Sequence, residues 1–367
     1  MAVEIRPVTF PDRLGSPEAV EFERYAEFAI AIEVERWGDD RLAYSPAEML
    51  AMYRDETYEK RQAFAAWDGD ACVGRTVTWW ERDPAAKTGT VIVEIAPAYR
   101  RRGLGSRMLE HAEGVITDLG RSIYLGWVDY PIAQLDLPGP RLSAPDGDAT
   151  IPAALPSVRF ATRHGYVIGQ LERSSALAID GRDDEFRAES ARREAAASDY
   201  RLVGWIDHVP DEFVDSYAAA RARMALDVPA GGLTIDEEQW DADRVRAHES
   251  QATGSGRSLL VQAAVAPDGS LAGYTELELP PGKRVAYQSD TLVVAAHRGH
   301  ALGMRMKLAN LVRLGEVAPE RTTVYTWNAD ENEHMLAINI ELGFRRCGLE
   351  AIWQRERDEP AAQADAG

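Results

Sequence analysis

Two short segments combine residue types that could bind a phosphate. The first reads Arg100-Arg-Arg-Gly103-Leu-Gly105, and the second reads Arg298-Gly-His-Ala301-Leu-Gly303. Each follows an apolar run typical of a β-strand and precedes a run typical of a helix. Glycine lets backbone N–H groups approach an anion closely, and the N-terminus of the following helix favours negative charge. Because the segments are 198 positions apart, the sequence predicts two related domains that can each hold a phosphate-bearing ligand.

Two acidic residues precede these segments and could act on a protonated amine. Glu94 lies six residues before Arg100, and Asp290 lies eight residues before Arg298. A carboxylate facing a bound ammonium could remove its proton and expose the nitrogen lone pair. The two offsets have the same parity, so both carboxylates should point to the same face of a sheet. Each residue is equally compatible with a strand-end charge that pairs with an arginine.

The elements expected around the first segment recur around the second. The first half should contain a strand in 3–9, a helix in 17–37, and a hairpin of strands at 62–67 and 72–80. The second half should contain a strand in 200–206, a helix in 211–225, and a hairpin of strands at 258–266 and 271–279. Asp68-Gly-Asp70 and Pro267-Asp-Gly269 contain turn-forming residues that tolerate a positive φ angle, so both hairpins are expected.

Each segment is followed by a helix, a strand and a closing helix. The strands are expected at 122–128 and 322–327, and the closing helices end at Gly165-Tyr166 and Gly343-Phe344, where glycine suits a left-handed C-cap. The distance from segment to cap is 20 residues longer in the first half. This excess falls in an inserted loop at 129–157, which either contributes to an acceptor pocket or is surface decoration.

This order of elements resembles the GNAT superfamily of acyl-CoA-dependent N-acyltransferases, repeated in tandem as in proteins of the mycothiol-synthase type. The resemblance implies an α/β fold of two GNAT-like domains, each a mixed, mostly antiparallel sheet with a splayed centre and helices on both faces. The boundaries are an N-terminal domain at 1–180, a linker at 181–199 that reads as an exposed connecting helix, and a C-terminal domain at 200–357. A polar tail at 358–367 is expected to be disordered.

The resemblance also implies where an acyl-CoA would bind. Backbone N–H groups of Arg101 to Ser106 would hold the pyrophosphate, and the pantetheine arm would pair with the strand that ends near Ile95. The implied donor-binding residues of the first half are Ile95, Arg100, Arg101, Arg102, Gly103, Leu104, Gly105 and Ser106. Those of the second half are Val293, Arg298, Gly299, His300, Ala301, Gly303 and Asn328, the last of which could instead pair with local backbone.

The sequence departs from the superfamily pattern at three points. Ala301 replaces the equivalent of Gly103, which costs about 1 kcal/mol if that position needs a positive φ angle. The tyrosine that often protonates the departing thiolate is replaced by Ala161 and Asn339. Tyr99, Tyr124, Tyr130 and Tyr325 are the nearby substitutes. His297 and His300 have a spacing seen in metal sites, but no acidic or thiol ligand lies beside them. Phosphate contact or a plain surface role is therefore favoured, and no metal is expected.

Composition limits the class of protein. The 367 residues carry a formal net charge of −19, which argues against nucleic-acid binding and fits a cationic acceptor. Two cysteines cannot form a disulfide framework and suggest a reducing, cytoplasmic compartment. The N-terminal residues do not resemble a signal peptide, and no apolar run is long enough for a membrane span.

The expected function is transfer of an acyl group from a thioester to a primary amine by direct attack. Acetyl-CoA is the expected donor, with a longer acyl-CoA or an acyl carrier protein as alternatives, and the acceptor is a small molecule, a natural product or a peptide. Glu94, Tyr99 and Asp290 are the candidate catalytic residues, and neither segment contains a cysteine for a covalent route. The alternative is a catalytically degenerate protein that binds CoA or serves as a scaffold. The identity of the active half and a homodimer are left open.

Overall fold

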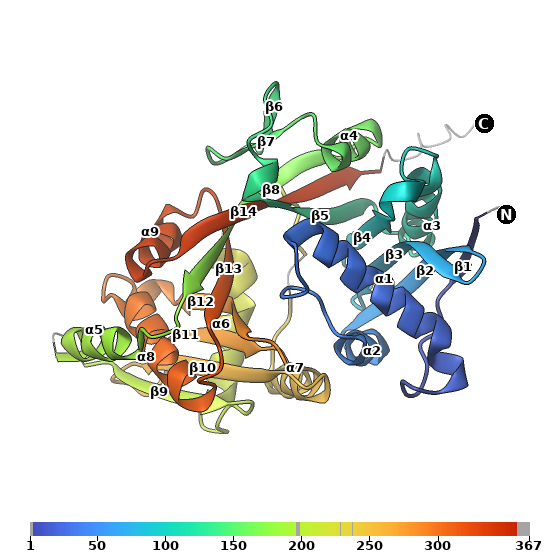
Figure 1. The fold of residues 1–367 in the computed structure, drawn as a ribbon. Helices are drawn as coiled ribbons and strands as arrows, with labels where there is room; N and C mark the ends of the chain where they lie inside the picture. Colours follow the sequence, from blue (N-terminus) through green and yellow to red (C-terminus); the bar gives the residue numbers. More distant parts are fainter. Residues whose placement is uncertain (1–2, 196–198, 228, 237, 358–367) are drawn as a thin grey trace, which may run out of the picture.

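Twelve strands of the described chain form one continuous mixed sheet that runs through both halves of the protein (Figure 1). The computed structural model describes residues 3–195, 199–227, 229–236 and 238–357. The strands of the first half are β1 (Glu4–Pro7), β2 (Glu59–Asp68), β3 (Ala71–Glu81), β4 (Thr88–Ile95), β5 (Ile123–Pro131) and β8 (Val167–Ala178). Those of the second half are β9 (Arg201–Ile206), β10 (Ser258–Val265), β11 (Leu271–Leu279), β12 (Val285–Val293), β13 (Thr323–Ala329) and β14 (Arg345–Glu356).

Helices cover both faces of each half. The helices of the first half are α1 (Val20–Trp37), α2 (Pro46–Arg54), α3 (Leu104–Asp118) and α4 (Pro156–Arg163). The helices that follow are α5 (Asp183–Ala195), α6 (Val214–Asp227), α7 (Ala242–Gly254), α8 (Leu302–Val317) and α9 (Glu333–Leu342). In the first half, α1 and α2 pack on one face, and α3 and α4 pack on the other. No helix among the described residues is long and apolar enough to cross a membrane.

The last strand of each half lies in the sheet of the other half. The strand order is β1-β2-β3-β4-β5-β14-β8-β13-β12-β11-β10-β9. β14 pairs with β5 of the first half, and β8 pairs with β13 of the second half. β14 and β8 also pair with each other, and both lie at the centre of Figure 1. The sequence predicted one sheet for each half, but this exchange joins them into a single sheet.

The sheet opens at one point in each half, as the resemblance implied. β4 and β5 pair in parallel only from Thr88 to Thr90 of β4, and β12 and β13 pair only from Val285 to Gln288 of β12. Where the first opening begins, Gly126 of β5 lies so close to β4 that an added Cβ atom would come within 2.8 Å of the Val91 carbonyl oxygen. A larger residue at this position would therefore push the two strands apart.

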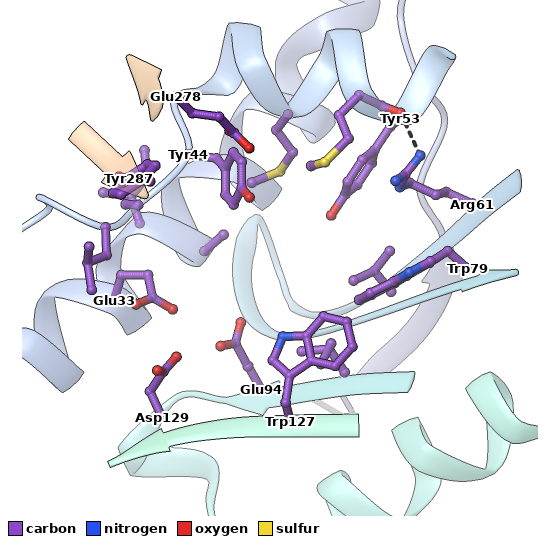
Figure 2. A pocket seen from close by; sticks show the side chains of 18 of the residues that line it. Glu33, Tyr44, Tyr53, Arg61, Trp79, Glu94, Trp127, Asp129, Glu278 and Tyr287 are labelled. Atoms are coloured by element: carbon purple, nitrogen blue, oxygen red, sulfur yellow. Dashed lines mark hydrogen bonds between the residues drawn. The ribbon is translucent and has the colours of Figure 1, made fainter. Parts of the chain in front are cut away.

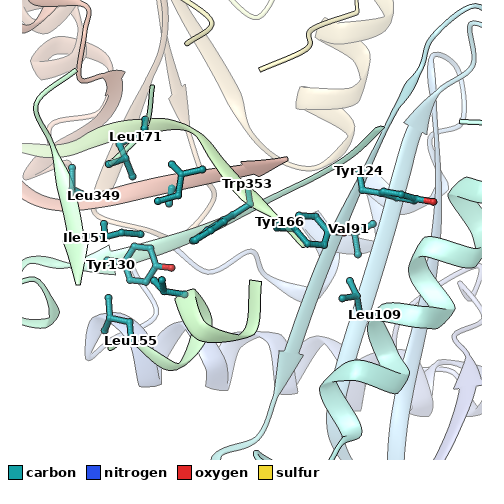
Figure 3. Packing of buried hydrophobic residues seen from close by; sticks show 14 of the residues in the cluster. Val91, Leu109, Tyr124, Tyr130, Ile151, Leu155, Tyr166, Leu171, Leu349 and Trp353 are labelled. Atoms are coloured by element: carbon teal, nitrogen blue, oxygen red, sulfur yellow. The ribbon is translucent and has the colours of Figure 1, made fainter. Parts of the chain in front are cut away.

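The core beneath the first opening packs residues from both halves. The labelled residues of Figure 3 come from β4, β5, β8 and β14, from α3, from the inserted segment around Ile151 and Leu155, and from Tyr166 just before β8. Leu349 of β14 is fully buried there beside Leu171 of β8. Because this apolar cluster includes strands of both halves, its burial stabilises them together.

The helices and strands expected from local patterns are present, and the structure contains two further α-helices that were not expected. Helices α2 and α7 were not predicted, although Ser45 and Glu48 form a capping box at the start of α2. The inserted loop was expected to be irregular, but it contains a short hairpin of β6 (Arg141–Ser143) and β7 (Thr150–Pro152). The predicted connecting helix is α5, and Phe186 packs it against the second half rather than leaving it exposed. The predicted disordered tail lies outside the described residues.

The two glycine-containing loops share a backbone conformation that glycine favours. In the first loop the φ angles of Arg101 and Gly103 are 61° and 81°, and in the second loop those of Gly299 and Ala301 are 86° and 52°. Each loop therefore has two left-handed positions, of which one is glycine and the other is not. Strain was expected at Ala301 if this position required a positive φ angle, and the structure shows that it has one.

We expect Ala301→Gly to raise the free energy of unfolding by about 1 kcal/mol, because glycine adopts this φ angle without steric cost. Ala301 is exposed, so the substitution removes little packing. Ala309→Gly, within α8, is the matched control and should lower the free energy of unfolding by about 1 kcal/mol. Urea denaturation of both variants checks the opposite signs, and a loss of stability in Ala301→Gly would contradict the strain.

Candidate functional site

Both glycine-containing loops lead into helices whose first turns receive no side-chain cap. The N-cap residue of α3 is Gly103 and that of α8 is Ala301. Neither residue has a side chain that could accept a hydrogen bond from the N–H groups of the first turn. Side chains of Ser45, Asp241 and Asn332 cap α2, α7 and α9, whereas α1 and α4 also lack a side-chain cap. Uncapped N–H groups at a helix N-terminus are suited to an anion. The backbone of both loops is therefore compatible with a phosphate, although Ala301 holds its position under strain.

Arg100 and Arg298 do not point into these anion sites, contrary to the expected phosphate contact. The guanidinium of Arg100 donates to the Ile95 carbonyl at 2.8 Å and pairs with Glu35 of α1 at 2.6 Å. Arg298 donates to the Val293 carbonyl at 3.2 Å and pairs with Asp227 of α6 at 3.0 Å. Both arginines thus fasten the loop to its strand end and to the first helix of its half.

Other residues expected at the loops have mixed surroundings. Arg101 and Arg102 are exposed beside the start of α3, whereas Leu104 is buried in the core. Ser106 Oγ lies 3.0 Å from His164 Nε2. Gly105 approaches the closing helix, because an added Cβ atom would lie 3.2 Å from the Phe160 ring.

A cavity of about 550 Å³ lies on the α1–α2 face of the sheet, beside the opening between β4 and β5 (Figure 2). Its walls come from α1, α2, the segment between them, β2, β3, β4 and β5, and residues of the second half close one side. The aromatic lining residues are Tyr44, Tyr53, Trp79, Trp127, Tyr287 and Trp327. The lining residues from the second half are Arg257, Glu278, Tyr287, Gln288, Ser289 and Trp327.

Glu94 lines this cavity, but it is held as a carboxylate between two arginines. Arg75 Nε donates to one of its oxygens, and Arg36 Nη2 donates to the other at 3.0 Å. Burial raises the pKa of Glu94, but the two guanidinium groups outweigh that effect and hold its pKa below the usual value. Its low proton affinity makes it a poorer base than the sequence analysis expected.

Two other carboxyl groups in the cavity have raised pKa values. Burial, with the nearby charges of Glu94 and Asp129, raises the pKa of Glu33 to about 7, even though Arg36 opposes the shift. Burial also raises the pKa of Asp129, although the charge of Arg36 and the hydrogen bond from Trp327 oppose the shift, and Glu94 adds to it. Figure 2 shows Glu33, Glu94 and Asp129 converging on the cavity from α1, β4 and β5. A carboxylate with a pKa near 7 is suited to accept a proton at neutral pH.

The candidate tyrosines are spread over different parts of the fold. The Tyr99 hydroxyl donates to Asp68 at 2.7 Å, and Tyr99 is not among the cavity-lining residues. Tyr124 bonds with Thr117 of α3, and Tyr325 accepts from Arg41. Tyr130 faces α4 and has a pKa raised to about 12, chiefly by burial. The expectation that Tyr99 contributes to catalysis is therefore not supported by its position.

The second half has a cluster of charged and aromatic side chains where the first half has the cavity. The Arg221 guanidinium of α6 lies 3.3 Å from Glu276 and 3.2 Å from Asp290. It also lies 4.4 Å from the centre of the Trp240 ring. Burial raises the pKa of Asp290 although Arg221 opposes the shift, and Tyr274 donates a hydrogen bond to the carboxylate. Asp290 and Glu94 thus face corresponding helices, as parity predicted, but both are paired with arginine.

The remaining predicted residues of the second half lie near its opening and its loop. Asn339 of α9 donates to Asn328 Oδ1 at 2.6 Å, which links the closing helix to β13. The buried Oδ1 atom of Asn339 has no hydrogen-bond partner among the described residues. The Tyr200 hydroxyl lies 3.0 Å from His297 Nδ1, and its ring lies 5.1 Å from that of His300. Within the described ranges, no cluster of three or more histidine, cysteine or acidic residues could hold a metal ion.

Glu33 and Asp129 were not predicted as site residues from the sequence. Asp129 was assigned to the inserted loop, but it lies within β5, two residues after Trp127. The alternation of Trp127 and Asp129 was the available signal, because alternate residues of a strand share a face. Glu33 lies within the long helix α1, and its sequence neighbourhood contains nothing that distinguishes it from the other acidic residues there.

Comparisons with known proteins agree with this arrangement. The acetyltransferase (GNAT) family model matches residues 28–131, which run from α1 to the end of β5. A tandem GNAT protein from the clavulanic acid biosynthesis pathway is similar over 98% of this chain and 100% of its own, with 24% identity and a TM-score of 0.72. A GCN5-related N-acetyltransferase from Sphaerobacter thermophilus is similar over 96% of this chain and 98% of its own, with 15% identity and a TM-score of 0.57.

Similarity to solved structures at these identities establishes the fold. No curated protein matches the sequence significantly. The whole-length structural match is to a tandem protein, and the family model matches the part of the first half that contains the opened strands, the Arg100–Gly105 loop and much of the cavity wall. The chain therefore has the fold of a tandem GNAT protein, and residues 28–131 match the acetyltransferase (GNAT) family model.

Proposed function

We propose that the first half is an acyl-CoA-dependent N-acyltransferase whose acceptor amine binds in the cavity on the α1–α2 face. The observation that carries the proposal is that the opening between β4 and β5 adjoins a cavity with ionisable carboxyl groups. A pantetheine arm in this opening would reach the cavity from the side of α3. We also propose 1–180 and 200–357 as the two GNAT units, with their closing strands exchanged.

The backbone at the opening supports the proposed donor position. From Val91 onward, β4 has no ladder partner on its β5 side. Polar backbone groups need a partner in a protein interior, and an extended acyl-pantetheine arm can provide one, as an added strand would. The start of α3 would then bind the pyrophosphate through the N–H groups of Arg101 to Ser106.

Glu33 is the proposed proton acceptor. The amine nitrogen attacks the thioester carbonyl carbon, the carbon–sulfur bond breaks, and the proton lost by the nitrogen passes to the Glu33 carboxylate directly or through water. The departing thiolate takes one proton from water and leaves as free CoA, and the proton held by Glu33 returns to solvent, so that one proton is lost by the nitrogen and one is gained by the sulfur. Since the pKa of Glu33 is raised to about 7, its carboxylate binds a proton more readily than Glu94 does.

The second half provides a wall of the site in this proposal rather than a second active centre. Its own corresponding face is filled by Arg221, whose side chain is 10% exposed. Because Arg221 fills this face, the second half also fits the alternative function, in which the protein is a catalytically degenerate scaffold. Incubation with labelled acetyl-CoA and a panel of primary amines tests the proposal. Persistent absence of product while CoA still binds would favour the scaffold.

We expect Gly103→Val to raise KM for acetyl-CoA by about tenfold or more, equivalent to about 1.4 kcal/mol of lost binding. Valine would be strained at a φ angle of 81° and would distort the anion-binding backbone. Gly299→Val introduces similar strain in the second loop, where φ is 86°, and should change KM by less than about threefold. Gly120→Val, after α3, is a control for strain alone. Steady-state kinetics check these values, and equal effects in both loops would contradict a single donor site.

We expect Glu33→Gln to lower kcat by about 100-fold or more, within the range of general-base contributions. The base must be deprotonated, so wild-type activity should rise as pH increases through about 7, the pKa of Glu33. The variant should lose this rise. Glu27→Gln changes an exposed residue of the same helix and should leave both activity and the pH profile unchanged. Retention of the wild-type profile by Glu33→Gln would rule out this role.

A further inference from the structure

The charged groups that line the cavity are paired with one exception. Glu33 and Glu94 contact Arg36, Glu59 contacts Arg61, and Glu278 contacts Arg257 at 2.6 Å. Asp129 has no arginine or lysine within ion-pair distance among the described residues. Its single hydrogen bond comes from Trp327 Nε1 at 3.4 Å. The cavity therefore has one end where a carboxylate has no direct ion pair within the described residues, although the charge of Arg36 still acts on it.

Asp129 is also the end of a row of carboxyl groups on three neighbouring strands. Glu350 of β14 is directly opposite Asp129 of β5 and directly opposite Glu172 of β8. Like charges directly opposite each other are unfavourable in a sheet. Burial and the neighbouring carboxylates raise the pKa of Glu172 to about 7 and that of Glu350 well above its usual value. A cation bound beside the row would favour the charged carboxylates and would therefore displace protons from it.

The second half shows how this face accommodates a cation. Arg100 and Arg298 contact Glu35 and Asp227 in equivalent ways, so these two acidic residues correspond. Six residues before each of them are Ala29 and Arg221. Ala29 lines the cavity of the first half. The second half therefore places a guanidinium, between carboxylates and beside an indole ring, where the first half leaves space.

The carboxylate partners of Arg221 correspond to cavity-lining residues as well. By position along the paired strands, Glu276 corresponds to Val77 and Asp290 corresponds to Ile92, and both apolar residues line the cavity. In the described cavity wall of the first half, the carboxylate without a direct arginine contact is Asp129, which lines the cavity with Trp127 and Trp327. Carboxylates combined with aromatic ring faces form a typical environment for an ammonium or guanidinium group.

We infer that the cavity selects an acceptor that carries a second positive charge, and that Asp129 binds this charge beside Trp127 and Trp327. This inference rests on the proposed function, because it names the class of acceptor for the same site. The amine to be acylated lies toward Glu33 and the opening, and the second ammonium or guanidinium lies toward the carboxyl row. A cavity of about 550 Å³ accommodates a small organic molecule with both groups.

Trp327 makes the second half part of this specificity. It belongs to β13 and reaches Asp129 across the exchanged strands. Tyr287 of β12 also lines the cavity, and its hydroxyl donates to the Arg41 carbonyl of the first half at 2.9 Å. The second half therefore contributes aromatic residues to acceptor binding while its own face is filled.

Binding of agmatine, 1,4-diaminobutane and 1-aminobutane to the full-length protein, measured by calorimetry without an acyl donor, tests the inference. At least one dication should bind about tenfold or more tightly than the monoamine. Asp129→Asn should remove this preference, and Glu350→Gln should weaken it. Asp268→Asn changes an exposed turn of the second half and should leave the preference intact. Equal affinity of all three amines, or an unchanged preference in Asp129→Asn, would overturn the inference.

The pH dependence of binding provides a second measurement. The charged groups that face the row are Glu33 and Arg36 of α1, Glu94 of β4, and Glu331 after β13. Because a cation displaces protons from the row, dication affinity should increase from pH 6 to pH 8 with net proton release. Affinity independent of pH would contradict the assigned binding groups. Because binding is measured without a thioester, it does not depend on acyl transfer. Selective dication binding together with no product in the separate incubation with acetyl-CoA would refute the proposed function and leave this inference standing.

Discussion

The pairing of β14 with both β5 and β8 is the constraint on which the rest of the structure depends. It gives β5 a full ladder on one edge, so β5 stays in the sheet where β4 turns away from it. The opening therefore leaves backbone groups unpaired mainly on the facing edges of β4 and β5, where a ligand can form hydrogen bonds with them. The same pairing aligns Asp129, Glu350 and Glu172 across three strands. One set of backbone contacts thus creates both the proposed donor channel and the charged end of the cavity.

The two halves show how a duplicated framework can carry different sites. Their loops have the same left-handed positions, and each uses an arginine to tie its strand end to its first helix. The difference arises from side chains at corresponding positions. With Ala29 the first helix leaves a cavity, whereas with Arg221 it fills the face with a guanidinium that Glu276 and Asp290 neutralise. A buried ion pair of this kind adds little net stability over an apolar core, but it occupies the space that an acceptor would need.

Local patterns predicted most helices, both hairpins and both loops, because these depend on neighbouring residues. The exchange of β8 and β14 was not predictable in this way, since both strands have similar patterns and either pairing satisfies the same local preferences. The structure does not support the predicted roles of Arg100 in phosphate binding and of Tyr99 in catalysis, and the sequence could not reveal this because it does not show where a side chain points. In the structure Arg100 points toward Glu35, and Tyr99 points toward Asp68. Glu33 and Asp129 are 96 positions apart, so their meeting in one cavity depends on the packing of α1 against the sheet.

The raised pKa values of the carboxyl row link the stability of the fold to the binding of a cation. An acid whose pKa is higher in the folded than in the unfolded protein binds protons more tightly when folded. The free energy of unfolding then falls as pH rises from about 4.3, the unfolded value of glutamate, and it stops falling above the folded value, which is about 7 for Glu172. At neutral pH the protein thus carries most of this cost, in addition to a net charge of −19. A cation at Asp129 would offset the cost only when bound. Relief of this unfavourable free energy would thereby contribute to the affinity for a cationic acceptor.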